Sequence, residues 1–257
     1  MNPDYTQVTE MPGSKVSEEN LRMLYTRYKW ASEFAIGKKV LEVGCGPGIG
    51  LGYLAKKAKR VIGSDYDANI VKIAQNYYTD RVDILQSDAQ YLPFKDNTFD
   101  VVILFEAIYY LPYPEKFLDE CKRILKKEGL VLICTANKNW EGFNSSPFSV
   151  KYFSVPELLN LFKTNNFEVE LLGNFPADSV SFMDKCKLIA RKAAVSLHII
   201  PKTMKGKEKL KRIFYGKLVD LPKEIKDEKT ENLLFELIDE TIPNYKYKVI
   251  YAVGHLK

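Results

Sequence analysis

The chain has 257 residues, of which 46% are hydrophobic and 28% charged, a balance typical of an ordinary globular protein. This composition excludes a disordered chain, a collagen-like chain and a small domain stapled by disulfides. The 38 basic and 33 acidic side chains give a net charge of +5, which is too small by itself to imply nucleic acid as a partner.

The cysteines and the N-terminus indicate the cellular setting. Cys45, Cys121, Cys134 and Cys186 lie far apart and form no cluster with the spacing of a zinc site, so we expect reduced thiols and no metal. The first thirty residues contain no apolar run of the kind found in a signal peptide, and no long apolar stretch follows. We therefore expect a soluble, cytoplasmic protein.

Short apolar runs alternate with helical patterns along most of the chain. Strands are expected at 40–43, 60–64, 82–86, 99–104, 129–135, 167–172 and 248–253, and helices at 21–31, 49–59, 68–77, 115–126 and 154–163. The last of these helices begins with a capping box formed by Ser154 and Glu157. Regular alternation of strand and helix is typical of a parallel sheet covered on both faces.

A glycine-rich turn follows the first of these strands. Glu42 is followed by Gly44, Cys45, Gly46 and Gly48. In parallel α/β sheets, ligands bind at the carboxyl ends of the strands, and glycine lets the backbone approach a ligand to contact distance. The turn lacks the glycine spacing of nicotinamide and flavin proteins and the Gly-Lys-Ser/Thr of a Walker loop. Its Glu-x-Gly-x-Gly-x-Gly spacing indicates a different class of site.

This turn resembles motif I of the class I S-adenosylmethionine-dependent methyltransferases, in particular the small-molecule, methyltransferase type 11-like group. Further parts of the family signature follow in order at Leu92-Pro93-Phe94, 97–102 and 123–129, although Glu128 stands where glycine is commoner. The similarity covers roughly residues 38 to 139, with a weaker match at 153–158.

The resemblance assigns cofactor contacts to two acids beyond the glycine turn. Asp65, 21 residues after Gly44 and followed by Tyr66, is expected to accept the ribose hydroxyls. The alternative role for Asp65 is a helix N-cap, but Asp67 is the better capping candidate. Asp88 is expected to bind the adenine amine, and the backbone amide of Ala89 is expected to meet the ring.

The resemblance also implies the fold and its division. We expect a doubly wound, seven-stranded, mostly parallel sheet of the Rossmann-like methyltransferase type, with the last strand antiparallel. Residues 1–36 are predicted to form an N-terminal helical cover, and residues 37–176 and 247–257 the S-adenosylmethionine-binding core. Residues 177–246, before the last strand, are predicted to form a helical insertion that caps the substrate.

The resemblance implies that residues 105–111 face the transferred methyl group. Phe105 is a candidate for lining the pocket, with packing in the core as an equal alternative, and Glu106 is a candidate for contacting the methionyl end. Many relatives carry two histidines where this chain has Tyr109 and Tyr110, and a tyrosine with a pKa near 10 is a poor base at neutral pH.

The sequence identifies no definite catalytic residue. Tyr109, Tyr110 and His198 are weak candidates for a base, and the apolar neighbours of His198 favour a structural role. Arg27, in the helix expected at 21–31, is a candidate for binding the methionyl carboxylate, although a solvated surface arginine is at least as consistent with the pattern.

Most of the net charge belongs to the expected insertion. Residues 177–246 contain 15 basic and 11 acidic side chains, and the basic segment 185–217 contains 11 basic residues and one acid. Three interpretations stay open: solvated helix faces, a site for an anionic acceptor, and a face that lies on anionic lipid. Nucleic acid is disfavoured because few aromatics interleave with the basic residues. The sequence does not indicate an oligomeric state.

These features predict an enzyme that moves a methyl group from S-adenosylmethionine to oxygen or nitrogen of a small-molecule acceptor and releases S-adenosylhomocysteine. One alternative is a lipid or quinone methyltransferase at the membrane surface. A second is a protein that binds S-adenosylmethionine without methyl transfer.

Overall fold

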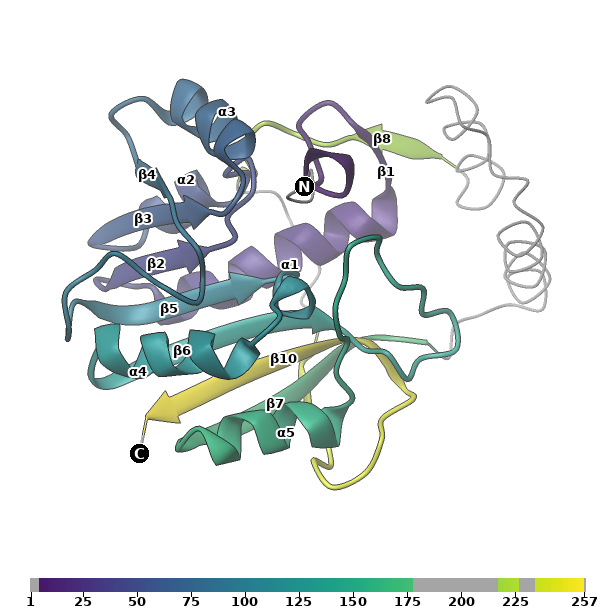
Figure 1. Cartoon of the computed structure of the whole chain (residues 1–257). Helices are drawn as coiled ribbons and strands as arrows, with labels where there is room; N and C mark the ends of the chain where they lie inside the picture. The colour runs from purple at the N-terminus through teal and green to yellow at the C-terminus, as the bar shows by residue number, and fades with distance from the viewer. Residues whose placement is uncertain (1–4, 178–216, 227–233, 257) are drawn as a thin grey trace.

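The computed structural model describes residues 5–177, 217–226 and 234–256, and its centre is one large sheet (Figure 1). The strand order is β4-β3-β2-β5-β6-β10-β7-β9. The parallel strands are β2 (Lys39–Val43), β3 (Arg60–Asp65), β4 (Asp83–Gln86), β5 (Phe99–Phe105) and β6 (Leu125–Ala136). The carboxyl ends of these strands therefore meet along one edge of the sheet.

The other side of the sheet contains the antiparallel strands. β10 (Tyr247–Leu256) lies between β6 and β7 (Phe167–Pro176) and runs antiparallel to both. The two-residue strand β9 (Glu236–Leu237) adds to the outer edge of β7. The predicted doubly wound, mostly parallel sheet with an antiparallel last strand is confirmed, and β9 extends it by one short strand that the sequence pattern does not predict.

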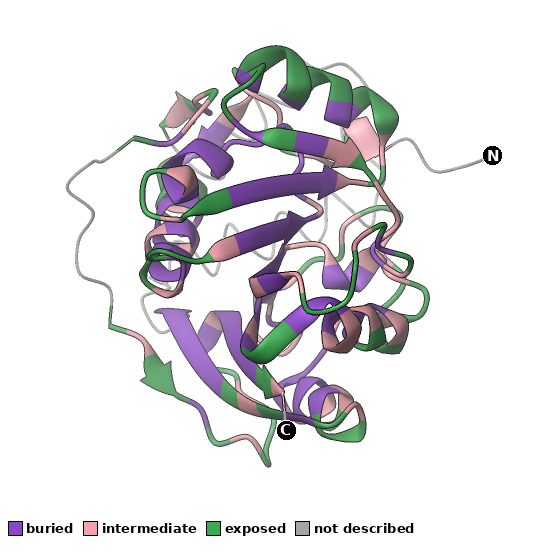
Figure 2. Ribbon diagram, turned by 90° about the vertical axis from the view of Figure 1, so that its left-hand side faces the viewer, coloured by how far each residue is buried: buried purple, intermediate pink, exposed green. Residues whose placement is uncertain are grey.

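Helices cover both faces of the sheet, and two hydrophobic clusters fill the space between. α1 (Glu18–Phe34), α2 (Leu51–Ala55) and α3 (Ala68–Tyr78) pack on one face, and α4 (Pro114–Ile124) and α5 (Val155–Thr164) on the other. Figure 2 shows the strands buried at the centre and the exposed residues on the outer sides of the helices. A sheet with two covered faces needs strands that are apolar on both sides, which is why the strand segments read as continuous apolar runs.

Side-chain caps fix where several helices begin. The Ser17 hydroxyl accepts a hydrogen bond from the Asn20 amide at the start of α1, which is longer than the helix predicted at 21–31. The predicted capping box at Ser154 and Glu157 is present at the start of α5. Each cap satisfies amide groups that a helix leaves unpaired in its first turn.

The described parts of residues 177–246 contain short strands and no helix, so the prediction of a helical insertion is wrong for 217–226 and 234–246. β8 (Leu218–Asp220) pairs antiparallel with β1 (Lys15–Ser17), and β9 pairs with β7. Short apolar segments beside open strand edges satisfy their backbone groups by pairing. Residues 178–216 and 227–233, which include Cys186, His198 and nearly all of the basic segment 185–217, lie outside the described residues.

The N-terminal segment passes over the edge of the sheet where the parallel strands end. It contains the short helix η1 (Tyr5–Gln7), then β1 and α1 (Figure 1). None of the helices in the described part of the chain has the length and apolar character needed to cross a membrane.

Candidate cofactor and acceptor site

A cavity of about 770 Å³ opens at the carboxyl ends of the parallel strands. Its wall comes from five parts of the chain: the N-terminal segment with α1, the glycine turn after β2, the ends of β3 to β6, the loop from 137 to 153, and the start of β10. A volume of this size is in the range of about 300–1,000 Å³ that small-molecule sites occupy. The cavity lies where a parallel sheet places its ligands.

The glycine turn has a backbone conformation that favours glycine. Gly44, Gly46 and Gly48 have φ angles of +67°, +57° and +82°. A Cβ on Gly44 would lie 3.0 Å from the Cβ of Ala107, and one on Gly48 would lie 2.8 Å from the ring of Tyr78. The turn is therefore a tight backbone cradle that side chains would fill.

Asp65 holds this turn at the end of β3. One carboxylate oxygen accepts a hydrogen bond from the Gly46 amide at 2.8 Å, and the other accepts one from the Asp67 amide at 3.0 Å. Burial raises the pKa of Asp65 above its usual value. Each oxygen keeps a second lone pair, so both can accept a ribose hydroxyl as well. Asp67 caps α3 through the Asn69 amide, as the sequence predicts.

Asp88 and Ala89 line the same cavity as Asp65 and follow Ser87, whose amide donates a hydrogen bond to the Asp65 carbonyl at 3.0 Å. The Asp88 carboxylate accepts a hydrogen bond from the Gln90 amide at 2.8 Å, which fixes its direction. Ala89 is buried, and Tyr66 lines the same region with 43% of its surface exposed. The two residues predicted to contact adenine are thus adjacent to the one predicted to contact ribose.

Glu42 is a buried carboxylate in the cavity wall. One oxygen accepts a hydrogen bond from the Tyr28 hydroxyl at 2.6 Å, and the other has no hydrogen-bond partner among the described residues. Burial raises the pKa of Glu42 to about 8. A nearby cationic ligand would stabilise its charged form, and S-adenosylmethionine is a cationic sulfonium, so the orphaned oxygen fits this cofactor.

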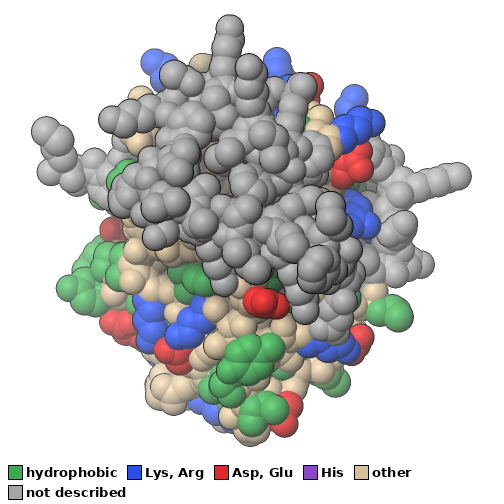
Figure 3. Space-filling model, turned by 90° about the vertical axis from the view of Figure 1, so that its right-hand side faces the viewer, with side chains coloured by type: hydrophobic (Ala, Val, Ile, Leu, Met, Phe, Trp, Pro, Cys, Tyr) green, Lys and Arg blue, Asp and Glu red, His purple; other side chains and the backbone are tan. Residues whose placement is uncertain are grey.

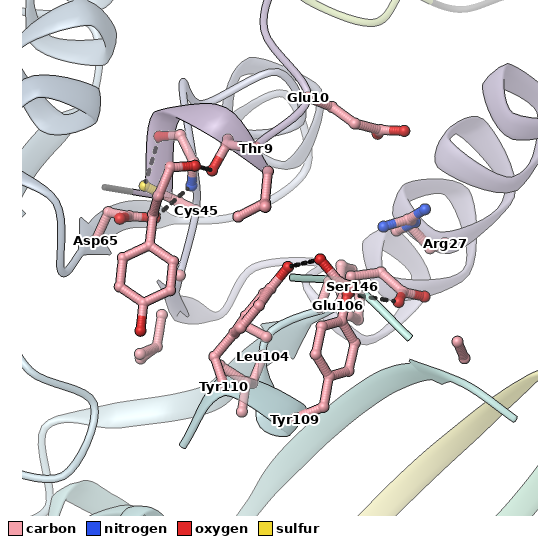
Figure 4. A pocket seen from close by; sticks show the side chains of 18 of the residues that line it. Thr9, Glu10, Arg27, Cys45, Asp65, Leu104, Glu106, Tyr109, Tyr110 and Ser146 are labelled. Carbon is pink, nitrogen blue, oxygen red and sulfur yellow. Dashed lines mark hydrogen bonds between the residues drawn. The ribbon is translucent and has the colours of Figure 1, made fainter. Parts of the chain in front are cut away.

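Arg27 and Glu106 point toward each other at the far end of the cavity, with Glu10 above them (Figure 4). Burial alone would lower the pKa of Arg27. The neighbouring Cys134, Glu106 and Glu10 outweigh burial and raise this pKa above its usual value, so the guanidinium stays charged. A guanidinium opposite a carboxylate complements the two charges of an amino acid end group. The pair suits the methionyl end of S-adenosylmethionine.

Two tyrosines after β5 form a fixed wall. The Tyr109 hydroxyl donates to Glu106 at 3.2 Å, and its ring stacks on Tyr152 with centroids 4.2 Å apart. The Tyr110 hydroxyl shares a hydrogen bond of 2.7 Å with Ser146 (Figure 4). Burial raises the pKa of both tyrosines, so both are neutral at physiological pH and poorly suited to act as bases.

Phe105 has both of the roles that the sequence left open. It lines the cavity, and it is buried against Tyr28 and Trp30 with ring centroids 5.5 and 6.3 Å away. Cys45 is buried in the glycine turn and also lines the cavity.

Two further parts of the cavity wall contain no residue that the sequence analysis names as a site candidate. The first is η1, where Tyr5 makes edge-to-face contacts with Tyr66, Tyr110 and Phe148. The second is the loop from 137 to 153, whose lining residues are Trp140, Gly142, Phe143, Asn144, Ser146, Phe148 and Val150. The aromatic residues of this loop are the signal that could have indicated its role.

Lys248 closes the wall on the side of the antiparallel strands. Its ammonium group forms an ion pair of 2.6 Å with Glu19 of α1 and lies 5.5 Å from the ring centroid of Trp140. It therefore joins the N-terminal segment, the loop from 137 to 153 and β10 at one point.

Similarity to known proteins identifies the family. A family model described as a methyltransferase domain matches residues 41–133. A probable S-adenosylmethionine-dependent methyltransferase from Mycolicibacterium smegmatis is 35% identical over 181 residues, which are 68% of this chain and 69% of that protein. The chain belongs to the S-adenosylmethionine-dependent methyltransferases. Its prediction as an enzyme that uses S-adenosylmethionine is confirmed.

One further relative and one solved structure are also similar to the methyltransferase. A fatty-acid O-methyltransferase from Mycolicibacterium smegmatis is 32% identical over 135 residues, which are 51% of this chain and 49% of that protein. The YcgJ protein from Bacillus subtilis has a TM-score of 0.59 at 17% identity and covers 91% of this chain and 99% of its own, which shows a shared fold. The aligned part of the methyltransferase covers only about half the length of the fatty-acid O-methyltransferase.

Proposed function

We propose that the protein transfers the methyl group of S-adenosylmethionine to an oxygen or nitrogen atom of a small-molecule acceptor. The observation that carries this proposal is the single cavity of about 770 Å³ that joins the glycine cradle to an aromatic wall. One end has the polar groups suited to the cofactor, and Tyr109, Tyr110 and Phe148 give the other end room and apolar surface for an acceptor.

Five groups of the chain are assigned to the cofactor. The protein backbone from Gly44 to Gly48 holds the sugar and the methionyl chain of the cofactor. Asp65 binds the ribose hydroxyls, and Asp88 with Ala89 binds the adenine. Arg27 holds the methionyl carboxylate. Glu106 provides negative charge that offsets the ammonium and sulfonium groups, and the cationic cofactor in turn favours the charged form of Glu42.

A bound S-adenosylmethionine would supply a methyl group to the acceptor's lone pair and keep the carbon–sulfur electron pair on sulfur, and a proton carried by the acceptor would be lost to solvent. The residues of the chain place the acceptor in line and exclude water. Positioning alone can supply about 7–11 kcal/mol of the barrier. This fits a site whose two candidate tyrosine bases are held neutral by burial.

A lipid or quinone acceptor at a membrane surface is the second candidate. The cavity wall includes Phe148 and Val150, which expose 43% and 58% of their surfaces. Exposed apolar side chains at the mouth of a site suit a ligand with a hydrocarbon chain. The name of the fatty-acid O-methyltransferase relative supports the same class.

The direct test measures S-adenosylhomocysteine formation with a panel of amines, phenols, hydroxy acids, fatty acids and quinols, beside calorimetric binding of S-adenosylmethionine. We expect turnover with at least one acceptor class. Cofactor binding without turnover on any acceptor would favour the alternative of a binding protein.

The membrane candidate has its own test, cosedimentation with liposomes that contain or lack anionic lipid. Phe148→Ser should weaken liposome binding if the mouth of the cavity contacts lipid, whereas Tyr113→Ser, at an aromatic outside the cavity wall that is 54% exposed, should not. Absence of binding to either liposome would count against this candidate.

A further inference from the structure

Residues 218–226, here called the strap, connect the N-terminal segment to the glycine turn (Figure 1). At one end β8 pairs with β1, and the Leu221 carbonyl accepts a hydrogen bond from the Gly13 amide at 2.8 Å. At the other end the Ile225 amide donates to the Ile49 carbonyl at 3.0 Å. Leu221 and Ile225 are buried in the core. Leu221 and Ile225 therefore anchor the strap on either side of residues 222–224.

Glu224 lies between these two anchors and packs against the start of α2. A Cβ on Gly52 would lie 2.1 Å from a carboxylate oxygen of Glu224, so the glycine makes room for this carboxylate. Glu224 accepts a hydrogen bond from Arg81 at 2.8 Å, and only 14% of its side chain is exposed. The ion pair ties the strap to the residues that follow α3.

Arg81 in turn lies over the ring of Tyr78, with its guanidinium carbon 4.8 Å from the ring centroid. Tyr78 is fully buried. Its hydroxyl donates to the Gly48 carbonyl at 2.7 Å and accepts from the Gly52 amide at 3.0 Å. Burial raises its pKa, so it remains a neutral hydroxyl that can make both bonds.

These contacts form one continuous path from the strap to the cofactor's glycine turn. Gly48 is the last glycine of the turn, and Gly52 lies in the first turn of the helix behind it. The Tyr78 hydroxyl thus bonds the backbone on both sides of the point where the turn becomes a helix. Tyr78, Arg81 and Glu224 are all absent from the cavity wall.

We propose that the strap positions the glycine turn for S-adenosylmethionine, with Glu224 holding Arg81 over Tyr78 and Tyr78 holding Gly48 and Gly52. Glu224 and Tyr78 are positioning residues, because they act on the cofactor only through the backbone of the turn. The proposal rests on the cofactor assignment. It makes cofactor affinity depend on a segment that is remote in sequence from the family's signature motifs.

The test is a double-mutant cycle in the full chain with Tyr78→Phe, Glu224→Gln and both changes together. Calorimetry measures the binding of S-adenosylhomocysteine well below the melting temperature. We expect Tyr78→Phe to weaken binding by about tenfold, since it leaves the Gly52 amide unpaired and leaves the Gly48 carbonyl with only its bond from the Leu51 amide, and Glu224→Gln by about threefold. The double variant should resemble Tyr78→Phe alone, because the carboxylate acts through the tyrosine.

Amide hydrogen exchange of Gly52 in the ligand-free protein gives a second readout. Exchange should be faster in both single variants than in the native protein. If Tyr78→Phe fails to fold, Glu224→Gln still decides the matter, because its carboxylate is partly exposed and its amide keeps the same shape. Weaker cofactor binding in this variant supports the proposal, and native affinity overturns it.

Asp83→Asn is the matched control. It removes a solvent-exposed ion pair between β4 and β3, formed by Asp83 and Arg60 at 2.7 Å, which is not part of the path through Glu224, Arg81 and Tyr78. Its affinity should remain native. Fully additive effects of Tyr78→Phe and Glu224→Gln would overturn the proposed path. A native affinity in Asp65→Ala would instead overturn the cofactor assignment, so the two failures are distinguishable.

Discussion

Asp65 connects the glycine turn to the sheet and is also the expected ribose ligand. Asp65→Ala removes both the acceptor of the Gly46 amide and the partner for the ribose hydroxyls. We expect S-adenosylmethionine affinity to fall at least about tenfold, since hydrogen bonds to a charged group are worth about 1.5–3 kcal/mol. Isothermal titration measures the change.

Asp67→Ala is the control for this variant. Asp67 caps α3, so its loss should lower stability by about 1 kcal/mol and leave cofactor affinity near native. Native affinity in Asp65→Ala would contradict the assignment of the ribose site.

Glu42 makes stability depend on pH. Its pKa is raised to about 8 in the folded protein, above the unfolded value of about 4.3, so the folded state binds the proton more tightly. The stabilisation from this proton is complete below the unfolded pKa and is lost as pH rises through the folded pKa. The native unfolding free energy should therefore fall by about 2 kcal/mol between pH 6 and pH 8 relative to Glu42→Gln. Urea denaturation at the two pH values tests this, and parallel pH profiles would contradict it.

Tyr109 and Tyr110 test whether the reaction needs a tyrosine base. Because burial raises the pKa of both hydroxyls, we expect Tyr109→Phe and Tyr110→Phe each to keep kcat within about tenfold of native on the acceptor found by the panel. A loss of about a hundredfold or more, with a shifted pH profile, would identify a tyrosine as the base.

For single residues, spacing along the sequence predicts roles that depend on a position just after a strand or just before a helix. Asp65 and Asp67 follow from their place after a strand, and the structure gives Asp67 its predicted cap. The orientation of Arg27 and Glu106 toward each other does not follow from spacing, because it depends on how α1 crosses the ends of the strands and on the positive φ of Glu106.

Among the elements, η1 covers the junction between the cofactor and acceptor ends of the cavity. Tyr5→Ala removes three edge-to-face contacts, each worth about 0.5–1.5 kcal/mol. We expect S-adenosylhomocysteine to dissociate at least about fivefold faster, measured by stopped-flow. Phe148→Ala, which removes one of these contacts, should have a smaller effect, and an unchanged rate in Tyr5→Ala would show that η1 does not retain the ligand.

The main strands follow from their continuous apolar runs and the longer helices from their period of buried residues, whereas the helix expected at 49–59 is only the five-residue α2. The short strands β8 and β9 do not follow from the sequence, since two or three residues carry no period and their pairing depends on edges supplied by distant segments. The roles of the strap and of the loop from 137 to 153 cannot be predicted from the sequence for the same reason. Their roles come from the surfaces they reach rather than from local pattern.

For the whole molecule, β10 completes the sheet from the far end of the chain. It pairs with β6 through Val249–His255 and with β7 along nearly its whole length. A chain ending at Lys246 would leave β6 with β5 alone and β7 with only the two-residue strand β9, and would expose the core between them. We expect such a chain to show no cooperative unfolding in urea by circular dichroism, and a native-like transition would contradict the central place of β10.

The sequence shows where most of the positive charge lies, and the described residues include almost none of that segment. The described side chains in Figure 3 mix basic, acidic and hydrophobic groups on one face. The basic segment 185–217 lies almost wholly outside the described residues, so its three interpretations remain predictions.

The chain's two tryptophans occupy different environments. Trp30 is buried between Phe34 and Tyr251, with centroids 5.3 and 5.0 Å away, whereas Trp140 lines the cavity beside Lys248. Replacing Trp30 by phenylalanine would leave a single indole at the acceptor side. Its emission would then report acceptor binding optically, without a label and before any product forms.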